Sequence, residues 1–426
     1  MNALSFSDLG LAEPLQRALH TEKYETPTPI QAQAIPALLQ GRDMIGIAQT
    51  GTGKTAAFGL PLLQRLAACQ EKVGPRQIHA LILAPTRELA VQIGESLAVY
   101  GRYTGLRNTV IVGGVGMGGQ VKALARGVDI LIATPGRLLD HVHQGNVQLG
   151  KAQVLILDEA DRMLDMGFIP DVRRIIAKLP RERQSLMFSA TMPKTVAGLA
   201  GEILKDPVRV EVTPEVVTVD RIAQHVIHVN APEKRQLLIG LLKDPKLSRV
   251  IVFTRTKRGA NKVAESLESA GVTVDAIHGN KSQNARQRAL DQFRIGKVRV
   301  LVATDVAARG IDVDGISHVV NYELPADATN YVHRIGRTAR AGAEGIALSF
   351  CDSSERGVLK DIEKLTRRPL AAMAIPFMLK SVPAEAPDKR QASRDGRGRS
   401  DEQRRPDQAQ YKKRRRRFKP QARQAA

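Results

Sequence analysis

The first residues that could do chemistry are those of a Gly-rich segment, AQTGTGKT, at positions 48–55. Glycines let successive backbone N–H groups converge on phosphates, and the helical pattern that follows adds the partial positive charge of a helix N-terminus. We expect Lys54 to neutralise β- and γ-phosphates and Thr55 to ligate Mg²⁺. Ala48 replaces the glycine that usually opens such a loop, and a Gly-rich turn can also arise by chance. The predicted phosphate-binding residues are Ala48, Gln49, Thr50, Gly51, Thr52, Gly53, Lys54 and Thr55.

A second candidate group is the cluster of acids that follows the apolar run VLIL. Four consecutive apolar residues indicate a buried strand, and open α/β sheets bind ligands where such strands end. We expect Asp158 to hold Mg²⁺ through water and Glu159 to orient and deprotonate the water that attacks the γ-phosphorus. Asp161 is expected to make interdomain hydrogen bonds. Acids that cap a helix are the alternative, which the preceding phosphate loop disfavours.

The elements that must position these residues follow an α/β rhythm. Between about residues 43 and 212, short apolar runs rich in β-branched residues alternate with helical patterns. Runs that are apolar throughout are typical of parallel strands buried on both faces and joined by helices. The predicted strands are MIGIA, ALILA, TVIV, DILIA, VLILD, SLMFS and VRVEV.

The same rhythm restarts after a Pro-containing polar stretch at residues 206–220, which is typical of a linker. The strands predicted there are QHVIHV, RVIVF, VDAIH, VRVLVA, HVVNY and GIALSF. The fold class is therefore α/β, with two tandem domains of parallel sheets flanked by helices. We place a first domain at 1–207, a linker at 208–218, a second domain at 219–380 and a tail at 381–426.

Composition and charge limit the function classes. A chain of 426 residues exceeds what one core usually supports, and its net charge of +21 attracts polyanions, so nucleic acid is the first partner to test. Two distant cysteines, Cys69 and Cys351, suggest neither a disulfide framework nor zinc. No apolar run reaches the length of a membrane span, and the first residues lack a signal-peptide pattern. We expect a cytoplasmic protein with no membrane partner.

The tail has almost no aliphatic residues, so it cannot bury enough surface to offset its ordering entropy, and we expect a disordered basic tail. Its block YKKRRRRFKP places six consecutive cations between two aromatic residues that could stack on unpaired bases. Auxiliary nucleic-acid binding is the functional interpretation, and a merely solvated basic tail is the alternative.

In their order from Tyr24 to Arg340, these motifs resemble those of the DEAD-box ATP-dependent RNA helicases. The opening FSDLGL and the stretch PTPIQAQAIPALLQGRDMIGIAQTGTGKTAAFGLPLL are most similar to the bacterial RhlE-type branch. The resemblance implies two RecA-like domains with ATP and Mg²⁺ between them and RNA across their top. It also implies RNA-stimulated ATP hydrolysis coupled to local, non-processive unwinding of short duplexes or to remodelling of RNA–protein complexes. Ribosomal precursors or a ribonuclease assembly would then be possible partners.

The resemblance also assigns roles to residues outside the phosphate loop and the acid cluster. Tyr24 would stack on adenine, and Gln31 would pair with its edge, because one donor and one acceptor match adenine and reject guanine. Lys23 stands where the family usually has glycine. Asp312 would bind the ribose hydroxyls of ATP.

Further family roles concern catalysis, domain coupling and RNA. Arg337 and Arg340 match arginine fingers that reach the γ-phosphate from the second domain, and His333 would brace the same region. Ser189 and Thr191 would couple Asp161 to the RNA-bound closed state, although a helix cap is the bland alternative. With Lys54, Asp158 and Glu159, these fingers and His333 form the predicted catalytic set. The predicted RNA contacts are Pro85, Thr86, Arg87, Gly114, Thr134 and Arg137 in the first domain and Thr254, Arg255, Arg286 and Thr304 in the second.

Two other functions stay open on the sequence. A processive DNA translocase of the same superfamily is disfavoured by Gln31 and by the DEAD string at 158–161. A non-enzymatic RNA chaperone, in which the basic tail does all the binding, would require the ATP motifs to be inert.

Overall fold

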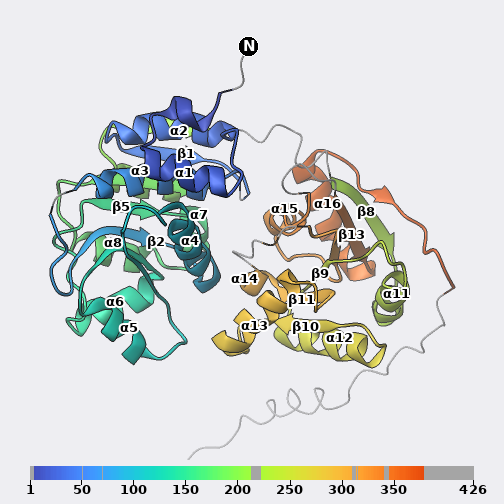
Figure 1. Cartoon of the computed structure of the whole chain (residues 1–426). Coiled ribbons are helices and arrows are strands. Elements are labelled where there is room, and N and C mark those ends of the chain that lie inside the picture. The colour runs from blue at the N-terminus through green and yellow to red at the C-terminus, as the bar shows by residue number, and fades with distance from the viewer. Residues whose placement is uncertain are drawn as a thin grey trace, which may run out of the picture. The chain divides into compact units, whose positions relative to one another are not determined.

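The computed structural model describes residues 4–49, 51–69, 71–212, 222–308, 313, 315–339 and 345–378 (Figure 1). Of the predicted site residues, Thr50, Asp312 and Arg340 lie outside the described residues, as does the predicted disordered tail. Among the helices of the described part, none is long and apolar enough to cross a membrane.

The first sheet has seven parallel strands in the order β3-β4-β2-β5-β6-β1-β7. Its inner strands are buried along almost their whole length, as expected for apolar runs that carry helices on both faces. The strands are β1 (Met44–Ile47), β2 (Ile78–Leu83), β3 (Asn108–Ile111), β4 (Val128–Ala133), β5 (Val154–Leu157), β6 (Gln184–Ser189) and β7 (Val208–Glu211).

Helices cover the two faces of this sheet in separate apolar layers. One layer contains the buried side chains of η1 (Phe6–Leu9), α1 (Glu13–Thr21), α2 (Pro29–Leu39), α3 (Lys54–Ala67) and α4 (Arg87–Tyr100). The opposite layer contains those of α5 (Met117–Leu124), α6 (Pro135–His143), α7 (Ala160–Asp165), α8 (Ile169–Ile176) and α9 (Lys194–Ile203).

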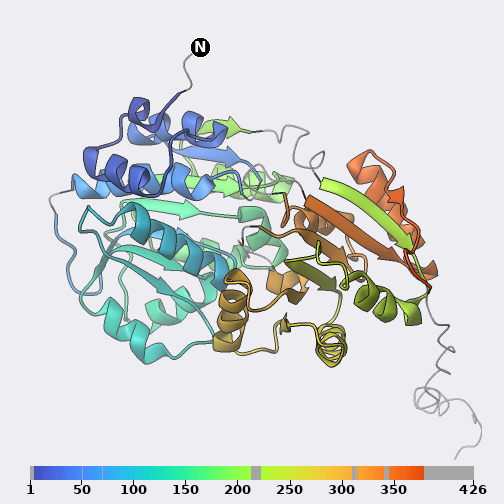
Figure 2. The same cartoon turned by 45° about the vertical axis from the view of Figure 1, so that its right-hand side comes forward.

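The second sheet repeats the plan with the order β10-β11-β9-β12-β13-β8-β14, all parallel. In Figure 2 the yellow-green β8 runs alongside the orange β13. The strands are β8 (Ile222–His228), β9 (Val250–Thr254), β10 (Val274–Ile277), β11 (Val300–Thr304), β12 (His318–Asn321), β13 (Gly345–Cys351) and β14 (Ala371–Ala372).

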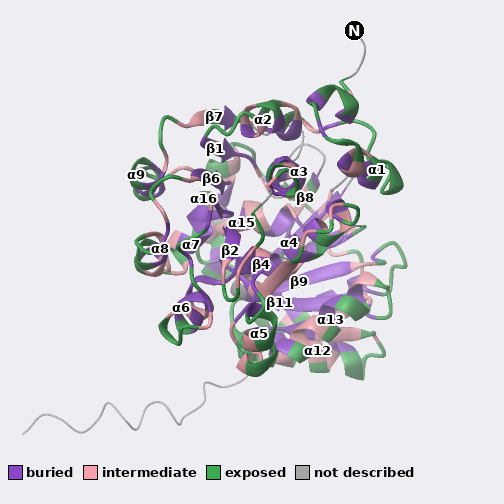
Figure 3. Ribbon diagram, turned by 60° about the vertical axis from the view of Figure 1, so that its left-hand side comes forward, coloured by how far each residue is buried: buried purple, intermediate pink, exposed green. Residues whose placement is uncertain are grey.

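The helices of the second half pack in three apolar clusters against its sheet. Figure 3 shows the pattern in both halves, with buried strands inside and exposed surface on the outer helices. The described helices of this half are η2 (Ala231–Glu233), α11 (Lys234–Leu241), α12 (Lys257–Ser269), α13 (Gln283–Arg294), α14 (Asp305–Ala308), α15 (Ala328–Ile335), η3 (Ser353–Glu355) and α16 (Arg356–Thr366).

The predicted fold class is confirmed: two tandem RecA-like α/β domains with parallel sheets. The start of the predicted linker is wrong, because residues 208–211 form β7, whose register with β1 pairs Met44 with Val208 and Ile47 with Glu211. The alternation of Val208 and Val210 with charged residues is that of an edge strand with one face on the core. The two-residue β14 was not predicted, because Ala371 and Ala372 have no strand pattern.

Candidate active site and nucleic-acid interface

The phosphate loop joins β1 to α3 and depends on two left-handed glycines. Gly51 and Gly53 have φ values of 88° and 89°, a conformation that side chains rarely adopt. Lys54 is the first residue of α3, and its buried Nζ donates a 2.8 Å hydrogen bond to the carbonyl oxygen of Ala48. The hydroxyl of Thr52 donates to the carbonyl oxygen of Gln49 at 2.8 Å. Thr55 follows Lys54 in the first turn of α3, half-buried.

Gln31 and Thr28 link the start of α2 to this loop. The Gln31 Oε1 atom accepts from the Thr28 backbone N at 2.8 Å, and its Nε2 donates to the Gly53 carbonyl at 3.1 Å. The Thr28 hydroxyl donates to the Thr52 carbonyl at 2.8 Å. A Cβ atom on Gly53 would lie 2.4 Å from Gln31 Nε2, so glycine is required there for space as well as for φ. The amide of Gln31 keeps one hydrogen and one lone pair for a second partner.

Tyr24 lies just before this segment, and its side chain is 47% exposed although it is a large aromatic residue. Phe6 and Tyr100 contact it, with ring centroids 6.5 Å and 6.1 Å away. Lys23, which precedes it, has a left-handed φ of 59°. The family's glycine at this position therefore has a conformational reason, and the lysine adopts the same backbone region at a cost.

The acid cluster lies at the end of β5 and is deeply buried. Asp158 and Glu159 are each 2% exposed, and Asp158 Oδ1 accepts from the Glu159 backbone N at 2.9 Å. Burial raises the pKa of Asp158 to about 6, against the opposing charge of Lys54. The influence of Lys54 shows that the fold brings the phosphate loop and the acid cluster together, at the ends of β1 and β5, the two strands on either side of β6 in the parallel sheet.

Asp161, the last acid of the cluster, is hydrogen bonded to two residues at the end of β6, Ser189 and Thr191. Its Oδ2 accepts from both the backbone N and the hydroxyl of Thr191 at 2.9 Å, and its backbone N donates to the Ser189 hydroxyl at 3.2 Å. Ser189 donates in turn to the Thr191 carbonyl at 2.7 Å. The structure therefore brings Asp161, Ser189 and Thr191 together. The hydrogen bonds found for Asp161 stay within the first domain instead of crossing to the second.

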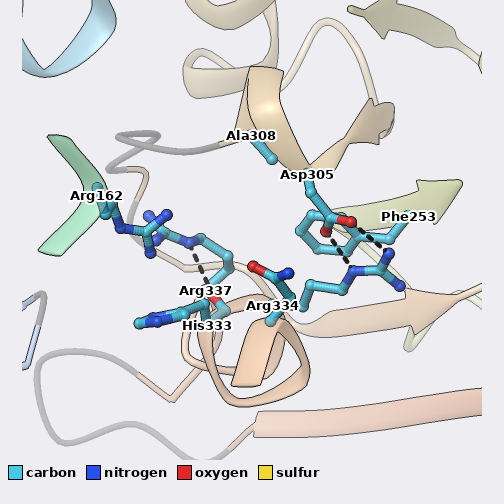
Figure 4. A pocket seen from close by; sticks show the side chains of 8 residues that line it. Arg162, Phe253, Asp305, Ala308, His333, Arg334 and Arg337 are labelled. Atoms are coloured by element: carbon cyan, nitrogen blue, oxygen red, sulfur yellow. Dashed lines mark hydrogen bonds and ion pairs between the residues drawn. The ribbon is translucent and has the colours of Figure 1, made fainter. Parts of the chain in front are cut away.

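Arg337 from the second half lies beside this acid cluster. It is 3% exposed, and its Nε donates to the His333 carbonyl at 3.2 Å. Burial lowers the pKa of Arg337 to about 10, with further lowering by Arg162 and an opposing effect of Glu159, so the guanidinium remains charged. Figure 4 shows the Arg162 and Arg337 side chains meeting next to His333. Arg162 itself pairs with Glu159 at 3.3 Å.

Arg334 differs from Arg337 although both belong to the same Arg-rich run. Its guanidinium binds the Asp305 carboxylate, donates to Asn321 Oδ1 at 3.1 Å and to the Glu323 carbonyl at 2.6 Å, and lies over the Phe253 ring. It is 1% exposed. Arg334 therefore braces the interior of the second domain, and it obtains its acid partner from outside the run.

The predicted first-domain RNA contacts surround the loop between β3 and α5. A Cβ atom on Gly114, whose φ is 76°, would lie only 2.0 Å from Nη1 of Arg87. Arg137 Nη1 donates to the Val115 carbonyl at 3.1 Å. Thr86, which follows Pro85, caps α4 by accepting from the Leu89 backbone N at 3.2 Å, and Thr134 occupies the same position before α6.

Arg286, a predicted RNA contact, and Gln283 both lie in the second half and interact with Glu88 of the first half. Glu88 was not identified from the sequence. Arg286 Nη2 lies 2.8 Å from Glu88 Oε1, and Gln283 Nε2 donates to the same oxygen at 3.1 Å. Gln283 Oε1 accepts from Arg87 Nη1 at 3.2 Å. Burial lowers the pKa of Arg87, and Arg286 and Arg137 lower it further, so three cations share this area. An acid in the first turn of a helix is so ordinary that nothing in the sequence distinguished Glu88.

The other predicted RNA residues of the second half lie at or next to the ends of β9 and β11. Arg255 contacts Glu355 Oε1 at 3.4 Å and Glu323 Oε1 at 3.7 Å. Thr254 ends β9, and its buried hydroxyl donates to the Thr256 carbonyl at 3.3 Å. Thr304 ends β11, the strand paired with β9 in register.

Comparison with known proteins agrees with this geometry. A family model described as "DEAD/DEAH box helicase" matches residues 28–199, and one described as "Helicase conserved C-terminal domain" matches residues 233–342. A protein named DEAD-box ATP-dependent RNA helicase CshA from Bacillus cereus is 43% identical over 374 residues, which cover 88% of this chain and 70% of that protein. Its namesake from Bacillus subtilis is 43% identical over 377 residues, covering 88% and 75%.

Among solved structures, S. cerevisiae Dbp5 bound to RNA and ADP BeF3 superposes with a TM-score of 0.79 at 36% identity. That match covers 88% of this chain and 96% of the yeast chain. The shared fold, the two matched helicase regions and the identity over most of both chains lead to one conclusion: the chain belongs to the DEAD-box family of ATP-dependent RNA helicases.

Proposed function

We propose that this protein hydrolyses ATP in a site completed by its second domain and uses that cycle to unwind short RNA duplexes locally or to remodel RNA–protein complexes. The observation that carries the proposal is the burial of Arg337 beside Arg162 and Glu159. The two buried guanidiniums of Arg162 and Arg337 beside the Glu159 carboxylate leave an excess of positive charge, and a further anion in the site would lower the cost of burying it. The transferred γ-phosphoryl group is such an anion.

The first domain supplies the groups that hold the triphosphate. Lys54 would leave the Ala48 carbonyl for the phosphates, while the loop amides and the start of α3 add positive potential. Tyr24 and Gln31 would recognise adenine, with Asp312 at the ribose. Glu159 would act as the base for the attacking water, because it is buried one residue from Asp158 and next to Arg162.

The residues present fit Mg²⁺. Asp158 and Thr55 offer a carboxylate and a hydroxyl, the hard oxygen ligands that Mg²⁺ prefers. Mg²⁺ commonly takes its remaining ligands from phosphates and water. When bound with ATP, Mg²⁺ would neutralise charge on the β- and γ-phosphates.

The cationic area of Arg87, Arg137 and Arg286, with Pro85, Thr86, Gly114 and Thr134, would bind the RNA backbone. Phosphate contacts position a strand without reading its bases, so we expect binding indifferent to sequence and weakened by salt. Arg255, Thr254 and Thr304 would extend this path along the second domain. Glu88 would give up Arg286 to a phosphate, because both compete for the same guanidinium.

Coupling follows from the division of the site between two domains. ATP and RNA can each favour the closed arrangement only by binding it more tightly than the open one, and sharing that preference makes their binding cooperative. Asp161, Ser189 and Thr191 connect the acid cluster to β6 and would transmit this preference. Arg340 would act with Arg337, and His333 would support both.

Several finer assignments belong to the same proposal. The opening FSDLGL supports the RhlE-type branch, although the two relatives described above carry the name CshA. The end of β7 supports extending the first domain from 1–207 to 1–211 and starting the linker beyond Glu211, and the start of β8 at Ile222 supports a second domain within 219–380. We also propose a cytoplasmic location, because RNA substrates are found in the cytoplasm. The proposed partners are ribosomal precursors or a ribonuclease assembly.

The deciding experiment measures ATP hydrolysis by the full chain with no polynucleotide, with single-stranded RNA and with single-stranded DNA, beside Lys54→Ala as the inactive control. We expect stimulation by RNA and little by DNA. Equal stimulation by DNA would favour a DNA translocase. If the wild type hydrolyses no more ATP than Lys54→Ala does, a non-enzymatic RNA chaperone would be favoured.

A further inference from the structure

Gln120 and His141 are buried polar residues of the first domain to which the mechanism above gives no role. Gln120 lies in α5 and is 8% exposed, and His141 lies in α6 and is fully buried. The His141 Nε2 atom lies 3.3 Å from Gln120 Oε1, and its Nδ1 atom lies 3.4 Å from Asn146 Nδ2. Buried polar groups are costly without partners, so these bonds fix where the side chains lie.

The chemistry of the partners sets the direction of each hydrogen bond. An amide oxygen can only accept, so His141 Nε2 must carry a proton and donate it to Gln120. An amide nitrogen can only donate, so His141 Nδ1 must be unprotonated and accept from Asn146. Burial and the charge of Arg137 lower the pKa of His141 below its usual range, against the opposing charge of Asp140, which favours this neutral form.

Gln120 in turn holds both ends of the loop between β3 and α5. Its Nε2 donates to the Val112 carbonyl at 3.1 Å and to the Gly116 carbonyl at 3.4 Å. These two carbonyls flank residues 113–115, which include the predicted RNA contact Gly114. Because glycines give a loop a wide choice of backbone conformations, its shape depends on what holds it. One buried side chain therefore ties the entry of the loop to its exit.

The helix of His141 also carries Arg137, another predicted RNA contact. Arg137 lies one turn before His141 in α6, and its Nη1 donates to the Val115 carbonyl at 3.1 Å. The helix thus holds the loop twice, directly through Arg137 and indirectly through His141 and Gln120. In the sheet, β3 and β4 lie at one edge, whereas β5 and β1, which carry the nucleotide residues, lie beyond β2. A loosened loop should therefore affect RNA and spare ATP.

We propose that His141 and Gln120 are positioning residues that hold the loop at 113–116 in the shape that receives the RNA backbone. The inference rests on the proposed function, in which Gly114 and Arg137 contact RNA. Both positioning side chains are buried, so they act through the loop. Loss of the His141 bond should weaken RNA binding by about threefold to tenfold and leave the KM for ATP and kcat at saturating RNA within about twofold of the wild type.

The experiment compares His141→Leu with His141→Gln and with the matched control His143→Leu. Leucine removes the donor, glutamine restores an amide N–H donor, and His143 is exposed on the same helix. ATP hydrolysis by the full chain is titrated with a single-stranded RNA oligonucleotide and then with ATP, and thermal melting monitors folding. His141→Leu should raise the half-activating RNA concentration, whereas His141→Gln and His143→Leu should stay close to the wild type.

Two further variants make the outcomes exclusive. Gln120→Met keeps the side-chain length and removes the bonds to both carbonyls, so it should weaken RNA binding at least as much as His141→Leu. The double variant should be no worse than Gln120→Met alone, because the two residues act in one chain. An unchanged half-activating RNA concentration in either single variant, or an equal change in the KM for ATP, would overturn the inference. Arg87→Ala tests the proposed function separately: if RNA activates it normally, the proposed RNA path fails, whatever His141 does.

Discussion

Asp161 holds Thr191 by two hydrogen bonds to one carboxylate oxygen, each 2.9 Å long, one from the backbone N and one from the hydroxyl. The two residues come from the ends of neighbouring strands, β5 and β6. The same acid influences His333 in the second half. The contact thus lies between the nucleotide-binding residues and the other domain, where a coupling element is needed.

Replacing Thr191 by Val should uncouple hydrolysis from unwinding. The substitution removes the hydroxyl bond and keeps the backbone bond and the side-chain shape, so the loss should be about 1 kcal/mol of local interaction. We expect RNA-stimulated ATP hydrolysis to change less than about twofold to threefold and duplex unwinding to fall more strongly, because the coupling between two binding sites is a free energy separate from that of the chemical step. Both are measured on one short duplex. Exposed Thr195→Val in α9 is the control, and parallel losses in both assays would count against a coupling role.

Glu159→Gln should nearly abolish hydrolysis while ATP and RNA still bind together. Gln keeps the shape and can still accept a hydrogen bond, but it cannot take a proton, so the rate should fall by about 10²- to 10⁴-fold. Phosphate release with RNA present measures the rate, and a gel-shift assay with ATP measures co-binding. Exposed Glu182→Gln serves as the control. Normal turnover in Glu159→Gln would show that another group is the base.

Acid should destabilise the protein through His333. Burial, together with the charges of Arg162 and Arg337, lowers the pKa of His333 from 6.5 to about 4. The unfolded chain therefore binds a proton before the folded chain does, so the stability contribution is complete above pH 6.5 and is lost as pH falls toward 4. The shift corresponds to something on the order of 3 kcal/mol when complete.

The test compares urea unfolding midpoints at about pH 7.5 and about pH 5 for the wild type and His333→Gln, with exposed His143→Gln as control. His333→Gln should lose less stability between the two pH values than the other two proteins. An identical loss in all three would mean that other groups cause the acid sensitivity.

Lys23→Gly should be more stable than Lys23→Ala. Both remove the long side chain, but only glycine relieves the left-handed φ of 59°. Relief of about 1–2 kcal/mol exceeds the extra chain entropy of glycine, about 0.5–1 kcal/mol, so the free energy of unfolding should differ by about 0.5–1 kcal/mol. At Lys262, exposed within α12, the order should reverse because glycine disfavours helices. Denaturant titration measures both pairs, and the same order at both positions would refute the strain argument.

The strands could be predicted because most of them are continuous apolar runs buried on both faces, such as Val154–Leu157 and Val250–Thr254. The phosphate loop and the acid cluster were likewise readable, since backbone geometry and residue type define them locally. The edge strand Val208–Glu211 was predicted within VRVEV although it carries charges on one face, whereas β14, which consists of two alanines, was not predicted.

Side-chain partners between distant segments could not be predicted. Glu88 and Arg162 lie in ordinary helical patterns, and the tertiary fold places them beside Arg286 and Arg337. Arg334 shows the same limit, because its acid partner Asp305 comes from another strand end. Whether an arginine is free to reach a ligand depends on packing, which spacing in the sequence does not encode.

The registers of β7 and β8 set a limit on domain opening. Glu211 pairs with Ile47, directly before the phosphate loop, and Ile222 pairs with Gly345, which packs against Thr338 beside Arg337. The last strand of the first domain therefore ends beside one half of the nucleotide site, and β8 begins near the other half. Nine residues separate Val212 from Ile222 in the sequence, and any chain of nine residues spans roughly 30 Å at most. Even with nothing bound, the arginine would remain at a high effective concentration near the phosphates, so each round of closure would be a short, intramolecular search.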